Sequence, residues 1–204
     1  MKSFFISTLF IICCNSAYCQ PILRALYGEL GGGYGTHGSI KGAINTVIYG
    51  NNIITVCYVF SSHKASGIPS DYIPGGLGGI FGRDIPHQNM EVHGLMYGKM
   101  LYCANSIIRV TLKGGISEVN VNTPMDFKPN QFPNGGFLSS ASNYTYTTKS
   151  DRVLGILLNP TLEMPFGKGL GMSFGLYANV NSVNSVYGLE VSLVFGKVRG
   201  NLPF

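Results

Sequence analysis

Four histidines are the residues of this chain that could most directly support catalysis or bind a metal. His37 precedes Ser39 by two positions, a spacing at which an imidazole can activate a hydroxyl for acyl transfer. The acidic residue that should orient such a histidine cannot be placed in the sequence. We therefore interpret His37-Gly38-Ser39 as the polar edge of a loop.

The other three histidines fall in or beside a single connecting segment that also contains carboxylates. A metal site needs ligands that converge on one point, and the irregular spacing of these side chains does not enforce convergence. The residues are His63, Asp71, Asp84, His87, Glu91 and His93. We predict no metal site, no cofactor and no enzymatic activity.

Six charged residues have a more consistent placement, because each lies on the small, polar face of a segment in which bulky and small residues alternate. They are Glu29, Lys41, Arg109, Lys113, Glu163 and Glu190. The interior of a small barrel is filled by side chains, so three acids and three bases could neutralise one another there in three pairs. We favour a structural plug over the alternative, a proton path or solute gate.

The segments that position these charges have a period of two, which is typical of a β-strand with two unlike faces. In the last segment, Tyr187, Leu189, Val191, Leu193 and Phe195 alternate with small or polar residues. Similar alternation predicts strands over 26–34, 39–49, 54–61, 92–102, 108–116, 154–164, 170–180 and 187–197. Pro160 removes one donor from its strand and predicts a bulge at that point.

The lengths of the connections indicate how these strands lie in a membrane. Segments 62–91 and 118–151 are long, whereas the alternate connections are tight turns. Long loops on one side and short turns on the other are typical of outer-membrane barrels. We predict an all-β protein, an eight-stranded antiparallel up-and-down transmembrane β-barrel. The alternative is a soluble secreted barrel of the lipocalin type, with its apolar face inside and an apolar ligand bound there.

Composition and the first residues favour export to the outer membrane. Charged residues make up 11% of the 204 residues, against about 25% in soluble domains. The net charge of +5 contains no run of Lys or Arg, so no nucleic-acid partner is expected. Lys2 and the apolar stretch that follows predict a signal peptide over 1–19, cleaved before Gln20. Residues 20–204 would then form the barrel domain.

Two cysteines, Cys57 and Cys103, remain after this cleavage. Cys103 falls in a turn, and Cys57 lies several residues along a strand, on the order of 15 Å away. A disulfide needs Cα atoms within about 7 Å, so we predict two free thiols.

Several short sequence motifs resemble those of a known protein family. They are Leu95-Met-Tyr-Gly-Lys99, Asn143-Tyr-Thr-Tyr146, Glu163-Met-Pro-Phe166, Tyr187-Gly-Leu-Glu190 and Phe195-Gly-Lys-Val-Arg199. With them the chain resembles uncharacterised outer-membrane β-barrel proteins of Bacteroidetes. The resemblance implies an outer-membrane barrel and transfers no catalytic residue. The His37-Gly38-Ser39 phrase is similar to the His-x-Ser pair of an outer-membrane lipid A deacylase, which keeps a lipid-modifying enzyme as an alternative.

Aromatic residues in or beside the two long connections are the candidate contacts for an extracellular partner. They are Tyr72, Phe81, Phe127, Phe132, Phe137, Tyr144 and Tyr146. The alternative is that they pack on one another or lie among lipid headgroups. The sequence thus predicts a barrel in contact with outer-membrane lipid, with a structural or surface-interaction role carried by two long extracellular loops.

Overall fold

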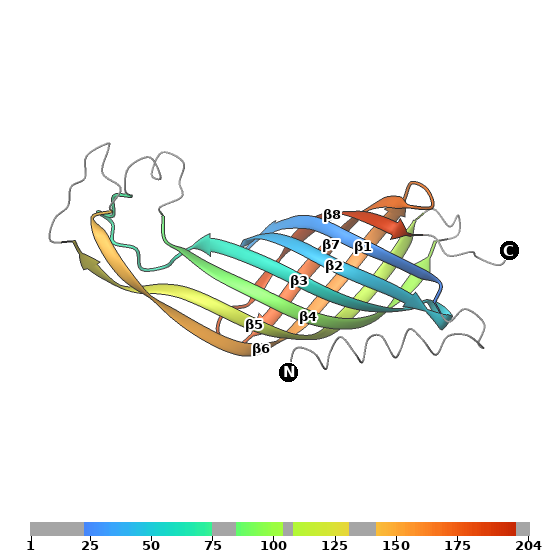
Figure 1. The fold of residues 1–204 in the computed structure, drawn as a ribbon, viewed down its shortest axis with the longest axis horizontal. Helices are drawn as coiled ribbons and strands as arrows, with labels where there is room; N and C mark the ends of the chain where they lie inside the picture. Colours follow the sequence, from blue (N-terminus) through green and yellow to red (C-terminus); the bar gives the residue numbers. More distant parts are fainter. Residues whose placement is uncertain (1–22, 75–84, 104–107, 131–141, 199–204) are drawn as a thin grey trace, which may run out of the picture.

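The chain folds into one closed barrel of eight antiparallel strands, each paired with the next and β8 paired with β1 (Figure 1). This computed structural model describes residues 23–74, 85–103, 108–130 and 142–198. The strands are β1 (Ala25–Gly35), β2 (Gly38–Ile48), β3 (Asn52–Lys64), β4 (His87–Tyr102), β5 (Arg109–Pro129), β6 (Tyr144–Pro165), β7 (Leu170–Asn181) and β8 (Val186–Lys197). Among the described residues, no helix has the length and apolar character needed to cross a membrane.

The barrel buries six of its charged strand residues inside and exposes apolar side chains outside, because successive side chains of a strand point to opposite faces. Every strand contributes an outward aliphatic residue that is 52–67% exposed, namely Leu30, Ile44, Val56, Leu95, Ile116, Ile156, Leu176 and Leu189. The six charged residues singled out in the sequence are all buried. The predicted fold class is therefore confirmed, and the soluble lipocalin-type arrangement, with the apolar face inside, is wrong.

Gly28 makes room for an aromatic ring at the seam between β1 and β8. Gly28 lies opposite Phe195 in the register, and a Cβ atom on Gly28 would stand 2.5 Å from the ring of Phe195. The aromatic ring therefore covers the bare backbone of β1 and fills the place that a side chain would take. A larger residue at position 28 would push this ring off the seam.

The predicted long loop over 118–151 is wrong, because most of it belongs to a hairpin. β5 and β6 are 21 and 22 residues long and continue past the barrel as a two-stranded ribbon (Figure 1). β4 pairs with β5 only as far as Asn122, and β7 pairs with β6 only as far as Gly155. The start of β6 is rich in Thr and Tyr, which have high β propensity. Because both of its faces are polar, its sequence shows no alternation of apolar and polar residues that would predict a strand.

The bulge predicted at Pro160 is also wrong. The flanking pairs Leu158↔Ala178 and Thr161↔Gly175 keep one register and place Pro160 opposite Leu176. Asn159 repairs the ladder, since its Nδ2 donates to the carbonyl oxygen of Leu176 at 2.7 Å. A side-chain amide thus replaces the N–H that proline lacks. The register shift in the β5–β6 pairing lies between Met125 and Lys128 instead.

The two described cysteines are both free, as predicted. Cys57 is buried in the barrel interior, and Cys103 is exposed at the end of β4. The predicted signal peptide lies outside the described residues.

Candidate functional site

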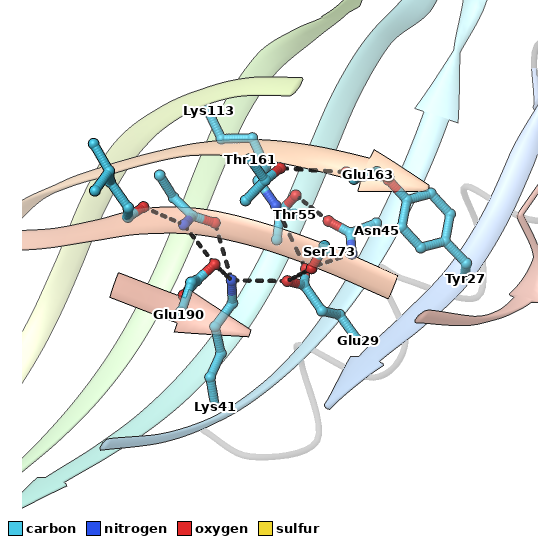
Figure 2. Close-up of polar contacts among 12 residues, drawn as sticks. Tyr27, Glu29, Lys41, Asn45, Thr55, Lys113, Thr161, Glu163, Ser173 and Glu190 are labelled. Atoms are coloured by element: carbon cyan, nitrogen blue, oxygen red, sulfur yellow. Dashed lines mark hydrogen bonds and ion pairs between the residues drawn. The ribbon is translucent and has the colours of Figure 1, made fainter. Parts of the chain in front are cut away.

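The centre of the barrel holds a network of four charges around Lys41 (Figure 2). Lys41 Nζ lies 2.7 Å from Glu190 Oε1 and 3.1 Å from Glu29 Oε1, and it donates a third hydrogen bond to Asn159 Oδ1 at 2.9 Å. Lys113 Nζ lies 3.5 Å from the other oxygen of Glu29. All three donors of the Lys41 ammonium group are therefore satisfied, and the two acids and two bases cancel.

Neutral side chains complete the hydrogen bonding of the two carboxylates, and Asn159 Nδ2 donates to Glu190 Oε1 at 2.7 Å. Ser173 Oγ donates to Glu29 Oε1 at 3.1 Å, and Asn45 Nδ2 donates to Glu29 Oε2 at 3.2 Å. Thr55 in turn holds Asn45, by donating to its Oδ1 at 2.6 Å. Buried charges are tolerated when they are paired and their remaining lone pairs accept hydrogen bonds. This shell provides both conditions inside the barrel.

A second, separate pair lies toward the end of the barrel that carries the short turns. Arg109 Nη2 lies 2.6 Å from Glu163 Oε2, and Arg109 Nε donates to the same oxygen at 2.8 Å. Tyr27 donates its hydroxyl to Glu163 at 3.1 Å, and its ring lies 5.0 Å from the guanidinium carbon. The expectation of three separate ion pairs is thus replaced by one four-charge network and one pair.

Buried apolar side chains pack above and below the Lys41 network. Toward the ribbon, Met90, Val92, Val119, Leu157 and Tyr177 belong to one buried cluster. Toward the short turns, Ala25, Val47, Ile53, Met100 and Val194 belong to another. The Lys41 network therefore lies between two buried apolar clusters, and packed side chains fill much of the described interior.

His37 lies at the ribbon end of the barrel, in the turn between β1 and β2. The amide of Asn184 lies 3.2 Å from His37 Nε2, and Thr36 Oγ1 lies 3.1 Å from His37 Nδ1. Asn184 also donates to Gln88 Oε1 at 3.0 Å, so His37 is linked to both the β7–β8 turn and β4. Burial and the neighbouring His63 ring, 4.9 Å away between centroids, lower the pKa of His37.

The contacts of His37 are those of a structural residue. Its ring nitrogens face Thr36 and Asn184, and no hydrogen bond joins it to Ser39 among the described residues. The remaining histidines and carboxylates were predicted not to form a metal site. In the described part of the chain, no group of three or more His, Cys, Asp or Glu side chains converges as metal ligands would.

The ribbon brings together four of the seven aromatic residues that were candidates for partner contacts. The ring of Tyr72 lies 6.3 Å from Tyr144 and 6.5 Å from Phe127, and Phe127 lies 5.5 Å from Tyr146. The other three, Phe81, Phe132 and Phe137, lie outside the described residues. At this site the aromatic residues pack on one another, which was the alternative interpretation.

Polar contacts fasten the β3–β4 connection to the ribbon beside this aromatic group. Tyr144 donates its hydroxyl to Asp71 Oδ2 at 2.9 Å, which raises the pKa of Tyr144. Asn143 donates from Nδ2 to the Asp71 carbonyl at 2.7 Å, and its Oδ1 accepts from the N–H of Ile73 at 2.7 Å. These hydrogen bonds therefore join the β3–β4 connection to the start of β6 in the ribbon.

Sequence reasoning missed the neutral partners of the buried charges. Asn45, Asn159 and Ser173 were visible only as small polar residues on the inner faces of their strands. Tyr27 was visible as an aromatic residue on the polar face, which was a signal of a buried partner. The pairings themselves needed the strand register, which brings residues as far apart as Lys41 and Glu190 into contact.

Comparison with known proteins supports the fold. No protein-family model matches the chain, and no curated protein matches it. The chain is similar in structure to the N-terminal β-barrel domain of Pseudomonas aeruginosa OprF, with a TM-score of 0.54 and 10% sequence identity. The match covers 84% of this chain and 96% of the OprF domain. The match to Ail, the attachment invasion locus protein of Yersinia pestis, has a TM-score of 0.49 and 4% sequence identity. It covers 84% of this chain and 96% of the Ail chain. The resemblance to a Bacteroidetes family stays a prediction.

Proposed function

We propose that this chain is an outer-membrane β-barrel protein that holds its projecting β5–β6 ribbon at the cell surface for contact with a partner. The observation that carries the proposal is the apolar outer surface of a closed barrel that buries six charged residues, the four of the Lys41 network and the Arg109–Glu163 pair, inside its wall. A surface of this kind is stable against lipid acyl chains, and a closed barrel leaves no strand edge unpaired within the bilayer.

The charged residues near the ribbon end of the barrel support the same placement. Glu118 and Arg152 are exposed on the outer surface, and Arg152 Nη2 lies 2.5 Å from Glu118 Oε1. They adjoin Ile116 and Leu154, which are 67% and 80% exposed and belong to the band of outward-facing apolar residues around the barrel, the belt. This ion pair suits the boundary between acyl chains and headgroups, with outer-membrane lipid as the partner of the belt. Export would use the signal peptide predicted over residues 1–19.

The role at the surface is assigned to the ribbon and not to the lumen. Buried apolar clusters pack on both sides of the Lys41 network and fill much of the described interior. The ribbon, in contrast, extends past the barrel and is braced by Asp71 and Tyr72. Segments that project from a rigid scaffold are suited to recognition. A lipid-modifying enzyme is less favoured, because His37 engages Thr36 and Asn184.

Membrane association and heat modifiability test the proposal together. The protein should resist extraction by alkaline carbonate and need detergent for solubility. An unboiled sample should migrate faster on a denaturing gel than a boiled one, because the closed barrel stays folded. A protein that is fully soluble without detergent, with one mobility in both samples, would overturn the proposal.

A further inference from the structure

The upper part of β6 has one long edge that no described strand covers. β7 pairs with β6 from Gly155 to Pro165 only, whereas β6 begins at Tyr144. Tyr146, Thr148, Ser150, Arg152 and Leu154 are all exposed. A row of unpaired N–H and C=O groups on such an edge is a template for another strand.

The direction of these groups follows from the proline in the same strand. Asn159 has to supply a donor to Leu176 because Pro160 has no N–H to give to β7. Even-numbered residues of β6 therefore direct their main-chain groups toward β7, and odd-numbered ones toward β5, since the two alternate in an antiparallel sheet. The bond from the N–H of Asn130 to the carbonyl oxygen of Asn143 agrees with this alternation. Above the barrel, the even-numbered residues thus face the open side.

The two edges of the ribbon differ in how well they could accept a strand. Beyond Asn122, the β5 edge contains Pro124, Pro129 and the irregular pairing between Met125 and Lys128. Prolines and bulges are the usual means of blocking an edge. β6 has no proline before Pro160 and keeps its register with β5 from Thr147 to Glu163. The β6 edge is the one left available.

The charges beside this edge specify the kind of segment that fits. Lys149 and Asp151 lie two residues apart on one face, with Nζ and Oδ2 2.9 Å apart, and both side chains are partly exposed. An antiparallel strand would place one residue opposite each of them. The best partner therefore carries an acid opposite Lys149 and a base two residues away opposite Asp151.

We propose that the β6 edge from Tyr146 to Leu154 binds an extended, proline-free segment of another protein, in which an acidic and a basic residue are two positions apart. The segment adds antiparallel to β6 in line with the end of β7, through main-chain hydrogen bonds to Tyr146, Thr148, Ser150 and Arg152. A third strand also stabilises the ribbon, because two-stranded hairpins are marginally stable alone. This inference rests on the proposed surface role of the ribbon.

The sequence of the edge itself provides a probe. A nine-residue peptide that copies Tyr146–Leu154, laid antiparallel about Ser150, places Asp opposite Lys149 and Lys opposite Asp151. A second peptide with its Lys and Asp exchanged places like charges opposite each other, which is destabilising. The two peptides have the same composition and net charge, so any difference between them reports register and pairing.

The test uses the full chain in lipid nanodiscs with a fluorescent form of each peptide. Fluorescence anisotropy should show binding of the copy peptide, and the exchanged peptide should bind about tenfold more weakly. Amide hydrogen exchange should slow at Thr148, Ser150 and Arg152 when the copy peptide is present. The odd-numbered neighbours Thr147, Lys149 and Asp151 should be protected in both states, because they bond to β5.

Matched variants separate main-chain pairing from side-chain contacts. Thr148→Pro with Ser150→Pro removes two N–H groups from the open edge and leaves the β5 ladder intact, and it should weaken binding at least about tenfold. Thr148→Ala with Ser150→Ala keeps these N–H groups and should bind like the unmodified chain. Exchange at odd-numbered residues checks that the ribbon of the proline variant remains folded.

Three results would overturn the inference. They are absence of binding by the copy peptide, equal binding to the proline and alanine variants, and protection of the even-numbered residues without peptide in a concentration-dependent dimer. The last result would mean that a second copy of the chain covers the edge. Failure of peptide binding by a barrel that inserts in nanodiscs contradicts this inference alone, whereas failure to insert contradicts the proposed function.

Discussion

Lys41 Nζ lies 2.7 Å from Glu190 Oε1, although the two residues are 149 positions apart in the chain. Their contact joins β2 to β8 across the lumen and makes the interior a neutral, hydrogen-bonded core. The same ammonium group contacts Glu29, so the stability of the barrel depends on Lys41 more than on either acid.

Substitutions in this network should have unequal effects. Lys41→Met leaves two carboxylates with only Lys113, and it should lower the free energy of unfolding by about 3–5 kcal/mol, because a buried charge loses its partner. Glu190→Ala should lower the free energy of unfolding by less, because Lys41 keeps its contacts with Glu29 and Asn159. Urea unfolding of the barrel in lipid vesicles measures both values.

A balanced double variant is the control for this interpretation. Lys41→Met with Glu190→Gln leaves one acid and one base, so it should recover part of the loss seen with Lys41→Met alone. The free energies lost in Lys41→Met and in Glu190→Gln could instead simply add in the double variant. In that case charge balance does not govern the stability of the network.

Asn159 and Pro160 should be coupled in stability. Asn159→Ala removes the donor to Leu176 O and a partner of Glu190, and it should cost about 1–3 kcal/mol. In a Pro160→Ala background the main-chain N–H can return to Leu176 O, so the same substitution should cost less. A double-mutant cycle of unfolding free energies gives the coupling, and strictly additive effects would argue against the repair of the ladder.

His37 should make the ribbon end of the barrel sensitive to acid. Its pKa in the folded state is lower than the ordinary value of about 6.5. The unfolded chain therefore binds more protons as the pH falls below that value, so the full stability is present above about pH 6.5 and declines toward the folded-state pKa. Protonation also removes the acceptor that faces Asn184.

NMR of the Asn184 side-chain amide from pH 8 to pH 5 would follow this change. His63→Gln removes the neighbouring ring that contributes to the shift, so the midpoint should move to higher pH. An Asn184 signal that stays constant across the range would contradict the role of His37 as its acceptor.

The purified protein should not conduct ions. Leu157, Met90 and Val92 lie in the apolar layer above the charges, and Met100 and Ile53 lie in the layer below them. Passage of an ion through this packed interior would require it to lose most of its water. Recordings in planar bilayers should show no single-channel steps, and regular steps of one size would contradict a filled lumen.

The sequence predicted the barrel and its inner charges because both depend on local alternation. Glu29 and Glu190 were assigned to the interior from the residues on either side of them. The four-charge network was not predictable, since the contact of Lys41 with both acids depends on register between distant strands. The upper part of β6 was missed because Thr147, Thr148, Lys149 and Ser150 are polar on both faces. Alternation detects a strand only where its two faces meet different solvents.

The orientation of the barrel tests the central proposal most directly. Cys103 is exposed at the end opposite the ribbon, and Thr148 is exposed on the ribbon. In a Gram-negative host, intact cells that carry Thr148→Cys in a Cys103→Ser background should react with a membrane-impermeant maleimide. Cys103 of the unmodified chain should react only after the outer membrane is permeabilised. Labelling of Cys103 in intact cells, or protection of residue 148, would contradict an outer-membrane barrel that displays its ribbon at the cell surface.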